Sequence, residues 1–199
     1  MSASRQTAFD IPANMTVEEF LEWCPEDGQR WQLVDGTPHA MAPGKTWHNS
    51  LQMEVGRQIG NHLLERGSRC IVGGPSGVIP QVRSRYNLRV PDLVVTCEPR
   101  VTNEAAVIAP LVIVEILSPS NQADTWANVW TYLTIPSLRE ILVLHSLKVR
   151  ADVLRRAEDG HWPDSPDTVT EGDLTLDSIG FRAPLIGLYR TTGLAASAE

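Results

Sequence analysis

The sequence predicts an α/β fold of the α+β kind, in which helices flank a mixed central sheet. The stretch PLVIVEIL at 110–117 is a short, nearly continuous apolar run, which is typical of a central strand covered on both faces. Leu51, Val55, Ile59 and Leu63 recur every fourth residue, which predicts a long helix. The elements follow in the order helix, hairpin, long helix, several strands, helix, strand, strand, which one mixed sheet can accommodate.

The length of 199 residues indicates a single domain. We expect residues 1–14 to be loosely packed and 15–199 to form the domain. The formal net charge of −7 argues against a basic nucleic-acid coat protein, so any nucleic-acid contact needs a local patch. Neither a bilayer-spanning run nor the apolar core of a signal peptide is present, so we expect a cytoplasmic protein without membrane contacts.

The first elements are a short helix and a hairpin. Thr16 to Glu19 form a capping-box pattern at the start of the helix, and Pro25 to Gly28 end it. The stretch 30–41 contains two extended runs around Asp35-Gly36, a strong hairpin signal. The long helix then runs from Thr46 to Arg66, with Gly67 suited to its C-terminal cap.

Strands are predicted through the middle of the chain and again near its end. The first group covers 70–72, 78–82, 88–96 and 110–117, with a loop at 98–109. The second is a pair at 140–145 and 149–156, expected to form a hairpin, followed by a loop at 157–168. The segment 174–189 is predicted to close the fold with a short strand and a helical turn.

A helix is predicted at 118–133, starting through a Ser-Pro-Ser cap and ending before Pro136. Its spacing places three apolar side chains on one side: Trp126, Trp130 and Leu133. Three polar side chains spaced four residues apart lie on another: Asp124, Asn128 and Tyr132. We interpret the tryptophans as core or dimer contacts rather than base-stacking platforms.

Two carboxylates interrupt the apolar strands. Asp92 starts one strand and Glu115 lies in the middle of another. A lone ionised carboxylate in a dry core costs several kcal/mol, so each acid needs an arginine partner, a raised pKa or a cation. If the two strands are neighbours, both carboxylates converge on one point and repel unless a proton or a cation lies between them. Hard oxygen donors of this kind favour Mg²⁺ or Mn²⁺.

These stretches resemble the PD-(D/E)XK nuclease superfamily, and within it the Uma-type family of proposed restriction endonucleases. The matching segments span roughly residues 15 to 190: WQLVDG (31–36), the start of the long helix around His48, RVPDLVV (89–95), IVEILSPSN (113–121), and the spaced Asp124 and Tyr132. The resemblance implies a restriction-endonuclease-like core that hydrolyses DNA phosphodiester bonds with a divalent metal. It also implies a homodimer, because related nucleases often cut two strands as dimers.

The resemblance also implies roles for individual residues. Asp92 and Glu115 bind the metal, and the backbone carbonyl of Ile116 adds a ligand. The metal lowers the pKa of an attacking water and neutralises a phosphate oxygen. His48 contacts water or phosphate, although capping or packing is the other interpretation of a lone histidine. With Asn128, these residues form the expected catalytic set.

The sequence departs from the family pattern at three positions. The superfamily lysine two residues after Glu115 is Leu117, and the helix position to which the Uma-type family moves that lysine is Asn128. Gln32 stands where the family often has glutamate. Asparagine can position water but supplies no positive charge. We therefore carry two hypotheses: a metal-dependent endonuclease, weakened by these losses, and an inactive binding or dimerisation module.

Few cations can replace the missing lysine. The chain has two lysines, Lys45 beside the start of the long helix and Lys148 in a predicted strand–strand turn. Three arginines alternate along one predicted strand and form either a phosphate-contacting stripe or a solvated face: Arg83, Arg85 and Arg89.

Three further observations concern single residues. Glu54 on the long helix is expected to face solvent rather than to serve as a third acid, and His145 is expected to be a satisfied sheet residue. The three cysteines lack metal-type spacing and are interpreted as reduced thiols: Cys24, Cys70 and Cys97.

Overall fold

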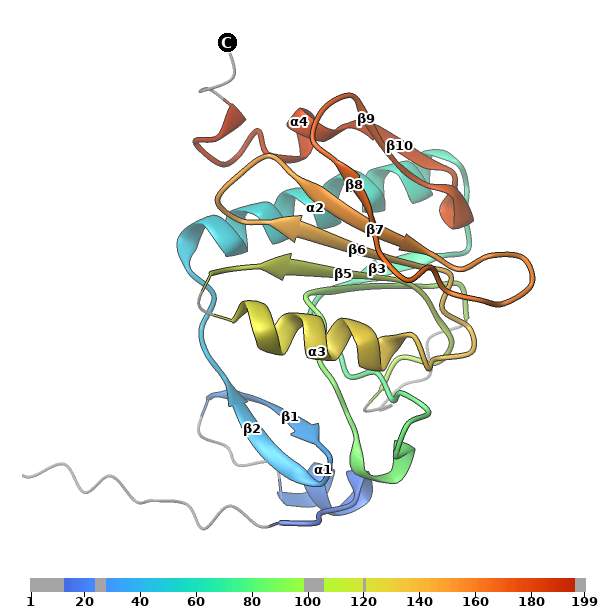
Figure 1. Cartoon of the computed structure of the whole chain (residues 1–199). Coiled ribbons are helices and arrows are strands. Elements are labelled where there is room, and N and C mark those ends of the chain that lie inside the picture. The colour runs from blue at the N-terminus through green and yellow to red at the C-terminus, as the bar shows by residue number, and fades with distance from the viewer. Residues whose placement is uncertain (1–12, 24–27, 99–105, 120, 196–199) are drawn as a thin grey trace, which may run out of the picture.

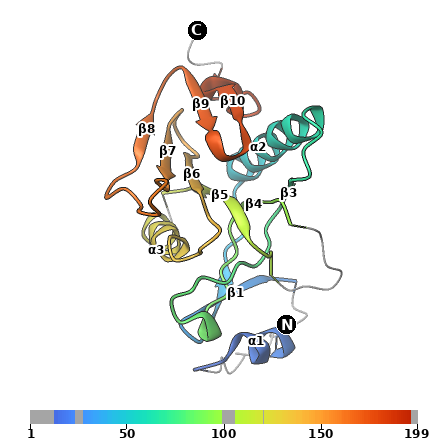
Figure 2. The ribbon, with the colours of Figure 1, turned by 90° about the vertical axis from the view of Figure 1, so that its right-hand side faces the viewer.

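A computed structural model describes residues 13–23, 28–98, 106–119 and 121–195. Its centre is a six-stranded sheet in the order β3-β4-β5-β6-β7-β8. The strands are β3 (Ile71–Gly73), β4 (Leu93–Thr96), β5 (Pro110–Leu117), β6 (Glu140–His145), β7 (Ala151–Arg155) and β8 (Asp167–Val169). Helix α2 (Thr46–Glu65) covers one face and α3 (Gln122–Tyr132) covers the other (Figures 1 and 2). The predicted mixed sheet flanked by helices is confirmed.

The sheet is mixed because β5 and β6 are parallel, whereas every other neighbouring pair in it is antiparallel. Two parallel neighbours need a crossover, and α3 supplies it. Strand β5 is buried on both faces, as its apolar run predicts. Val112, Val114 and Ile116 pack in the cluster that includes α2, while Ile113 and Leu117 pack with α3.

The N-terminal part forms a small unit beyond α3, with its own apolar cluster (Figure 1). It consists of α1 (Val17–Trp23) and the hairpin of β1 (Arg30–Val34) and β2 (Thr37–Met41). The capping box is confirmed, since the backbone N–H of Thr16 donates to Glu19 Oε2 at 2.7 Å and that of Glu19 donates to Thr16 Oγ1 at 3.2 Å. The hairpin turn is also confirmed, with φ of 50° at Asp35 and 86° at Gly36.

Two predicted strands are shorter than expected. Within 78–82, Val78 forms only an isolated bridge to Arg89, and the chain continues to a short 3₁₀ helix, η1 (Ser84–Tyr86). Within 88–96, the regular strand begins at Leu93. Pro80 and Pro91 explain both differences, since neither has an N–H to donate to a ladder.

The predicted hairpin of β6 and β7 is confirmed, and β8 extends it from within the end of the predicted loop. The prediction for 174–189 is incomplete because this region contains two strands rather than one. The elements here are β9 (Asp173–Leu176), the 3₁₀ helix η2 (Asp177–Ile179), β10 (Phe181–Pro184) and α4 (Leu185–Leu188). Their apolar side chains join the cluster on the α2 side of the sheet.

Helix α3 starts later than predicted, at Gln122, and buries a different face. Its buried residues are Thr125, Asn128, Val129 and Tyr132. Trp130 is 44% exposed, and Trp126 is only partly buried. Trp130 is therefore not a core residue, which leaves the dimer contact as the prediction for it. Asn128 and Tyr132 turn inward because the sheet and its flanking loop offer them hydrogen-bond partners, whereas Asp124 is exposed.

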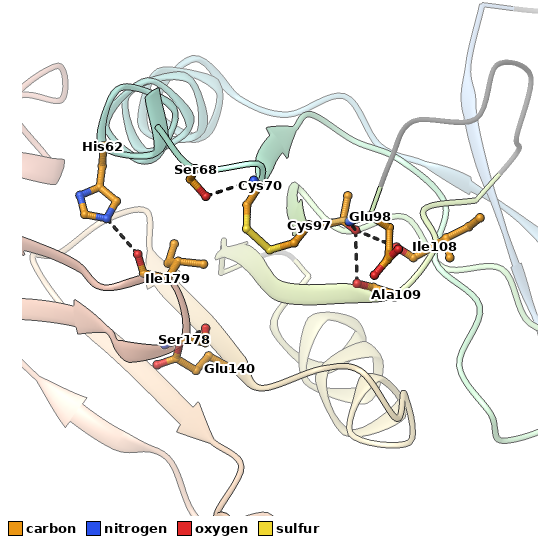
Figure 3. Close-up of a disulfide and its surroundings, with 11 residues drawn as sticks. His62, Ser68, Cys70, Cys97, Glu98, Ile108, Ala109, Glu140, Ser178 and Ile179 are labelled. Carbon is orange, nitrogen blue, oxygen red and sulfur yellow. Dashed lines mark hydrogen bonds between the residues drawn. A yellow bond between two sulfur atoms is a disulfide. The ribbon is translucent and has the colours of Figure 1, made fainter. Parts of the chain in front are cut away.

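The interpretation of all three cysteines as reduced thiols is also wrong. Cys70 and Cys97 form a disulfide between β3 and β4 (Figure 3). Ile71 pairs with Thr96, so the two cysteines lie one step beyond this pair and face each other across the strands. Sequence spacing does not reveal this pairing because it depends on register. Cys24 lies outside the described residues.

Two other expectations concern the N-terminal segment and helices that could cross a membrane. The loosely packed segment predicted at 1–14 falls almost wholly outside the described residues. None of the helices that the structure describes combines the length and the apolar character needed to cross a bilayer.

The double-sided core around β5 and β6 should be sensitive to cavities. Leu142 is fully buried, so Leu142→Ala should lower the free energy of unfolding by about 2–5 kcal/mol. Leu147→Ala is the matched control, since this leucine is 57% exposed, and it should cost no more than about 0.5 kcal/mol. Urea denaturation measures both, and equal losses would contradict this description of the core.

Candidate active site

The register of β4 and β5 brings the two acids together. Leu93 pairs with Val114 in this antiparallel ladder, so Asp92 and Glu115 are opposite each other one step further along. Side chains alternate between the faces of a sheet, and Val94 packs on the α3 side. Both acids therefore project toward α3, as the sequence predicts for carboxylates on neighbouring strands.

Three residues from two elements, β5 and α2, hold Asp92 in place. Its Oδ2 accepts a hydrogen bond from the backbone N–H of Ile116 at 2.8 Å and lies 3.1 Å from His48 Nε2. Its backbone carbonyl accepts a hydrogen bond from Gln52 Nε2 at 2.7 Å. His48 and Gln52 are four residues apart on α2, so both lie on one face of that helix and contact the residue that precedes β4.

Glu115 is more deeply buried and accepts a hydrogen bond from Tyr132. The residue is only 6% exposed, and Tyr132 Oη donates a hydrogen bond to Glu115 Oε1 at 2.8 Å. Burial, and then the negative charge of Asp92, raise the pKa of Glu115 well above its ordinary value, while the Tyr132 hydroxyl opposes this shift. Burial and the charge of Glu115 likewise raise the pKa of Tyr132.

His48 contributes a titratable group at Asp92. Burial opposes its protonation, but the hydrogen bond and the charge of Asp92, together with neighbouring Asn49, outweigh burial and raise the pKa of His48. The structure thus brings His48 to the acids, as the family resemblance implies. In the described part of the chain, neither Asp92 nor Glu115 forms an ion pair with lysine or arginine.

Asn128 lies one helical turn before Tyr132 and is buried. Its Oδ1 accepts a hydrogen bond from Arg89 Nη1 at 2.7 Å. Arg89 also donates through Nε to Asn87 Oδ1 at 3.2 Å. Asn128 is therefore beside the acid pair and in contact with a cation.

The sequence alone did not reveal the contributions of Gln52 and Arg89. The signals were present: Gln52 follows His48 by one helical turn, and Arg89 precedes Asp92 by three residues. The prediction that Arg83, Arg85 and Arg89 alternate along one strand face was wrong. Arg83 adopts a left-handed backbone at φ 46°, Arg85 lies in η1, and Arg89 is buried, so they share no strand face.

The remaining candidate cations and acids lie elsewhere. Lys45 is exposed at the start of α2, and Lys148 is exposed in the turn between β6 and β7. Glu54 is 4% exposed rather than solvent-facing, and it pairs with Arg57 at 2.8 Å and with Arg190 at 2.6 Å. These arginines compensate its charge, which makes it a structural acid.

The structure also places three other residues that the sequence pattern singles out: His145, Leu117 and Gln32. His145 Nε2 lies 2.7 Å from Asp152 Oδ2, which confirms a satisfied sheet residue. Leu117 packs in the core on the α3 side. Gln32 lies in β1, and its Oε1 is buried without a donor among the described residues.

The acid pair has the composition of a Mg²⁺ or Mn²⁺ site rather than of a zinc site. In the described residues, no group of three or more His, Cys, Asp or Glu side chains could hold a metal. Magnesium is typically bound through one or two carboxylates, with water and substrate phosphate completing its shell. Asp92 and Glu115 supply that number of carboxylates.

The backbone N–H and carbonyl of Ile116 point toward the β4 side, where Asp92 lies. The carbonyl of Leu117 accepts a hydrogen bond from Ser146 N–H on the β6 side, at 3.0 Å. Neighbouring strand residues direct their polar groups to opposite sides, so Ile116 faces the β4 side, where its N–H meets Asp92.

Known proteins resemble this chain in sequence and in fold. The profile of a family described as "Uma2: Putative restriction endonuclease" matches residues 17–185. An uncharacterized protein of Synechocystis is 31% identical over 183 residues, which cover 91% of this chain and 93% of that protein. A crystal structure from Anabaena variabilis, titled as a putative nuclease of family DUF820, has a TM-score of 0.72 at 17% identity. That match covers 89% of this chain and 98% of the other.

The raised pKa values of Glu115 and His48 predict a pH dependence. The folded state favours the protonated form of each group, so the stabilisation is complete below the ordinary pKa values of 4.5 and 6.5. It is lost as the pH rises through the raised values. The thermal midpoint of the metal-free protein should therefore fall, relative to Glu115→Gln, between about pH 5 and about pH 8.

Magnesium should reverse this trend, because metal binding must displace a proton from Glu115. The rise in thermal midpoint on adding excess Mg²⁺ should be larger at about pH 8 than at about pH 5. A rise of the same size at both pH values would show that Glu115 is already ionised without metal.

The Tyr132 hydroxyl should support metal binding from behind Glu115. Tyr132→Phe removes the hydrogen bond that stabilises the carboxylate form, so Mg²⁺ affinity should fall by about 10-fold or more. Isothermal titration calorimetry measures this loss. Tyr189→Phe is the matched control, since that hydroxyl donates to the backbone of Arg150 away from the acids. Equal affinities in the two variants would disprove the supporting role.

Proposed function

The chain belongs to the Uma2 family, and from this premise we propose that it is a divalent-metal-dependent endonuclease that hydrolyses DNA phosphodiester bonds. One observation carries the proposal. Asp92 and Glu115 face each other across β4 and β5, with no lysine or arginine paired to either acid in the described residues. Two such carboxylates need a proton or a cation between them, and the raised pKa of Glu115 expresses that need.

Asp92 and Glu115 would hold Mg²⁺ or Mn²⁺, with the Ile116 carbonyl as a further ligand. When bound, the metal supplies Lewis-acid stabilisation of phosphate charge and lowers the pKa of an attacking water. The donor set fits this role, because one oxygen of each carboxylate already has a protein donor. Ile116 and His48 contact Asp92 Oδ2, Tyr132 contacts Glu115 Oε1, and the two carboxyl groups also contact each other, so a cation would replace the proton between them.

The other residues orient these acids. Gln52 fixes the backbone of Asp92, and the β5 amide of Ile116 fixes its carboxylate, so Asp92 cannot rotate freely. His48 can hold a proton beside Asp92 and offer it to an anionic oxygen there, because the contact with Asp92 raises its pKa. We expect His48 to act on water or phosphate in this way, and Asn128 to help order the site through its amide.

A second candidate is an inactive nuclease-fold protein that serves as a binding or dimerisation module. The observation that favours it is that neither Lys45 nor Lys148 forms an ion pair with the acids among the described residues. Leu117 fills the core where the superfamily pattern has a lysine. On this hypothesis the half-exposed Trp130 would belong to an interface between two copies.

Cleavage of DNA separates the two candidates. Purified protein with Mg²⁺ or Mn²⁺ should cut supercoiled, linear duplex or single-stranded DNA, and Asp92→Ala and Glu115→Ala should each slow cutting by at least ~100-fold. Glu171→Ala, at an exposed acid in a distant turn, is the control and should cut normally.

Calorimetry supplies the second arm. The endonuclease should bind Mg²⁺ or Mn²⁺, and Glu115→Ala should abolish the heat of binding. If the wild-type protein cuts no more DNA than Asp92→Ala does and also gives no metal-binding heat, the endonuclease proposal fails and the inactive module is favoured.

A further inference from the structure

Arg89 is a buried cation that lacks an acidic partner. Its residue is 6% exposed, and it is the one lysine or arginine that is buried among the described residues. No described carboxylate lies within ion-pair distance of its guanidinium. A buried charge without a counter-charge is costly, so proteins normally pair it. Glu54, by contrast, is a buried charge with two arginines on it.

Neutral groups hold the guanidinium instead. Nη1 donates to Asn128 Oδ1 at 2.7 Å, and Nε donates to Asn87 Oδ1 at 3.2 Å. Asn87 is itself fixed by Asp35, whose backbone N–H donates to Asn87 Oδ1 at 3.0 Å and whose Oδ1 accepts from Asn87 Nδ2 at 3.0 Å. These contacts orient the guanidinium without a carboxylate directly on it, and the charge of Asp35, behind Asn87, acts on it from beyond ion-pair distance. No described residue accepts a hydrogen bond from Nη2.

The guanidinium also lies near Tyr132, which contacts the acid pair. Asn128 lies one helical turn before Tyr132 on α3, and Tyr132 donates to Glu115. Arg89 lies close enough to Tyr132 that its charge acts on the phenol and favours the ionised form. On its other side, Arg89 precedes Asp92 by three residues on the segment that leads into β4. The Arg89 guanidinium, which is paired with no described carboxylate, thus lies on the α3 side of the two acids.

We infer that Arg89 binds a non-bridging oxygen of the DNA phosphate on which Asp92 and Glu115 act; this inference rests on the proposed function. A phosphodiester is the anion that such a charge lacks, and a guanidinium presents planar N–H donors suited to phosphate. Asn128, at the position where the resemblance implies a lysine, then has the task of aiming Arg89. Exposed Arg83 instead pairs with Asp35 and lies over the Tyr86 ring, and the charge of exposed Arg85 acts on Glu19, so both face the N-terminal unit.

The first test compares Arg89→Gln with Arg85→Gln as the matched control. Arg89→Gln should slow cleavage by about 10²–10³-fold, as expected for loss of one stabilising donor to the reacting group. Arg85→Gln should cut as the wild type does. Adding Asn128→Lys to Arg89→Gln should recover at least about tenfold of the lost rate, because it returns a positive charge to the same flank. Circular dichroism verifies that each variant is folded.

The second test reads phosphate contact without cleavage. In the Glu115→Gln background, a labelled DNA duplex is titrated between about 50 and about 200 mM salt. Arg89→Gln should reduce the slope of log affinity against log salt by about 1, and Arg85→Gln should leave it unchanged. Arg89→Lys, which keeps the charge, should retain the slope and supplies the comparison if Arg89→Gln does not fold.

The outcomes separate the two proposals. If the wild type does not cleave DNA, the endonuclease fails, yet a slope lowered by Arg89→Gln still supports the phosphate contact. If the wild type cleaves and Arg89→Gln cuts within about threefold of it, the role of Arg89 is overturned. The role is equally overturned if Arg89→Gln is slow but keeps the wild-type slope and gains nothing from Asn128→Lys, since Arg89 is then structural.

Discussion

Two carboxylates opposed across one step of a β ladder are costly in a buried setting, and the neighbouring elements are arranged around that cost. Asp92 and Glu115 occupy adjacent positions at the end of the β4–β5 pairing. Each acid has a protein donor on one oxygen, from Ile116 and His48 in one case and from Tyr132 in the other. These donors fix the carboxylates without neutralising both charges, so the pair favours a shared proton or a cation.

Both faces of the sheet contribute to this arrangement. Helix α2 supplies His48 and Gln52 to Asp92, although its main apolar contacts lie on the opposite face of β5. Helix α3 supplies Tyr132 and Asn128 from the face toward which the acids project. The crossover between parallel β5 and β6 is what places α3 there, so the topology and the site have a common origin.

The cation on the α3 flank of the acid pair does not come from the helix itself. The helix carries Asn128, and the positive charge comes from Arg89 on the loop before β4. Asn87 and Asp35 hold that arginine from the hairpin side, so the N-terminal unit is mechanically linked to the candidate site. An arginine oriented by amides keeps its full charge available to an anionic ligand, which an acid partner would prevent.

Local patterns predicted most of the secondary structure because short-range chemistry decides it. The capping box at Thr16, the Asp35-Gly36 turn and the spacing of α2 each act within a few residues. The longer predicted strands failed at Pro80 and Pro91, where a missing N–H outweighs apolar alternation.

The sequence by itself determined the sheet, its long helices and the fact that two acids sit in apolar strands. It also carried the family resemblance that points to a nuclease. Only the tertiary structure decided that α3 buries Asn128 and Tyr132 rather than Trp130, that Cys70 meets Cys97, and that Arg89 lies beside the acids. Those contacts join residues far apart in the chain. They depend on strand register and on the rotation of a helix about its axis, which local residue spacing does not reveal.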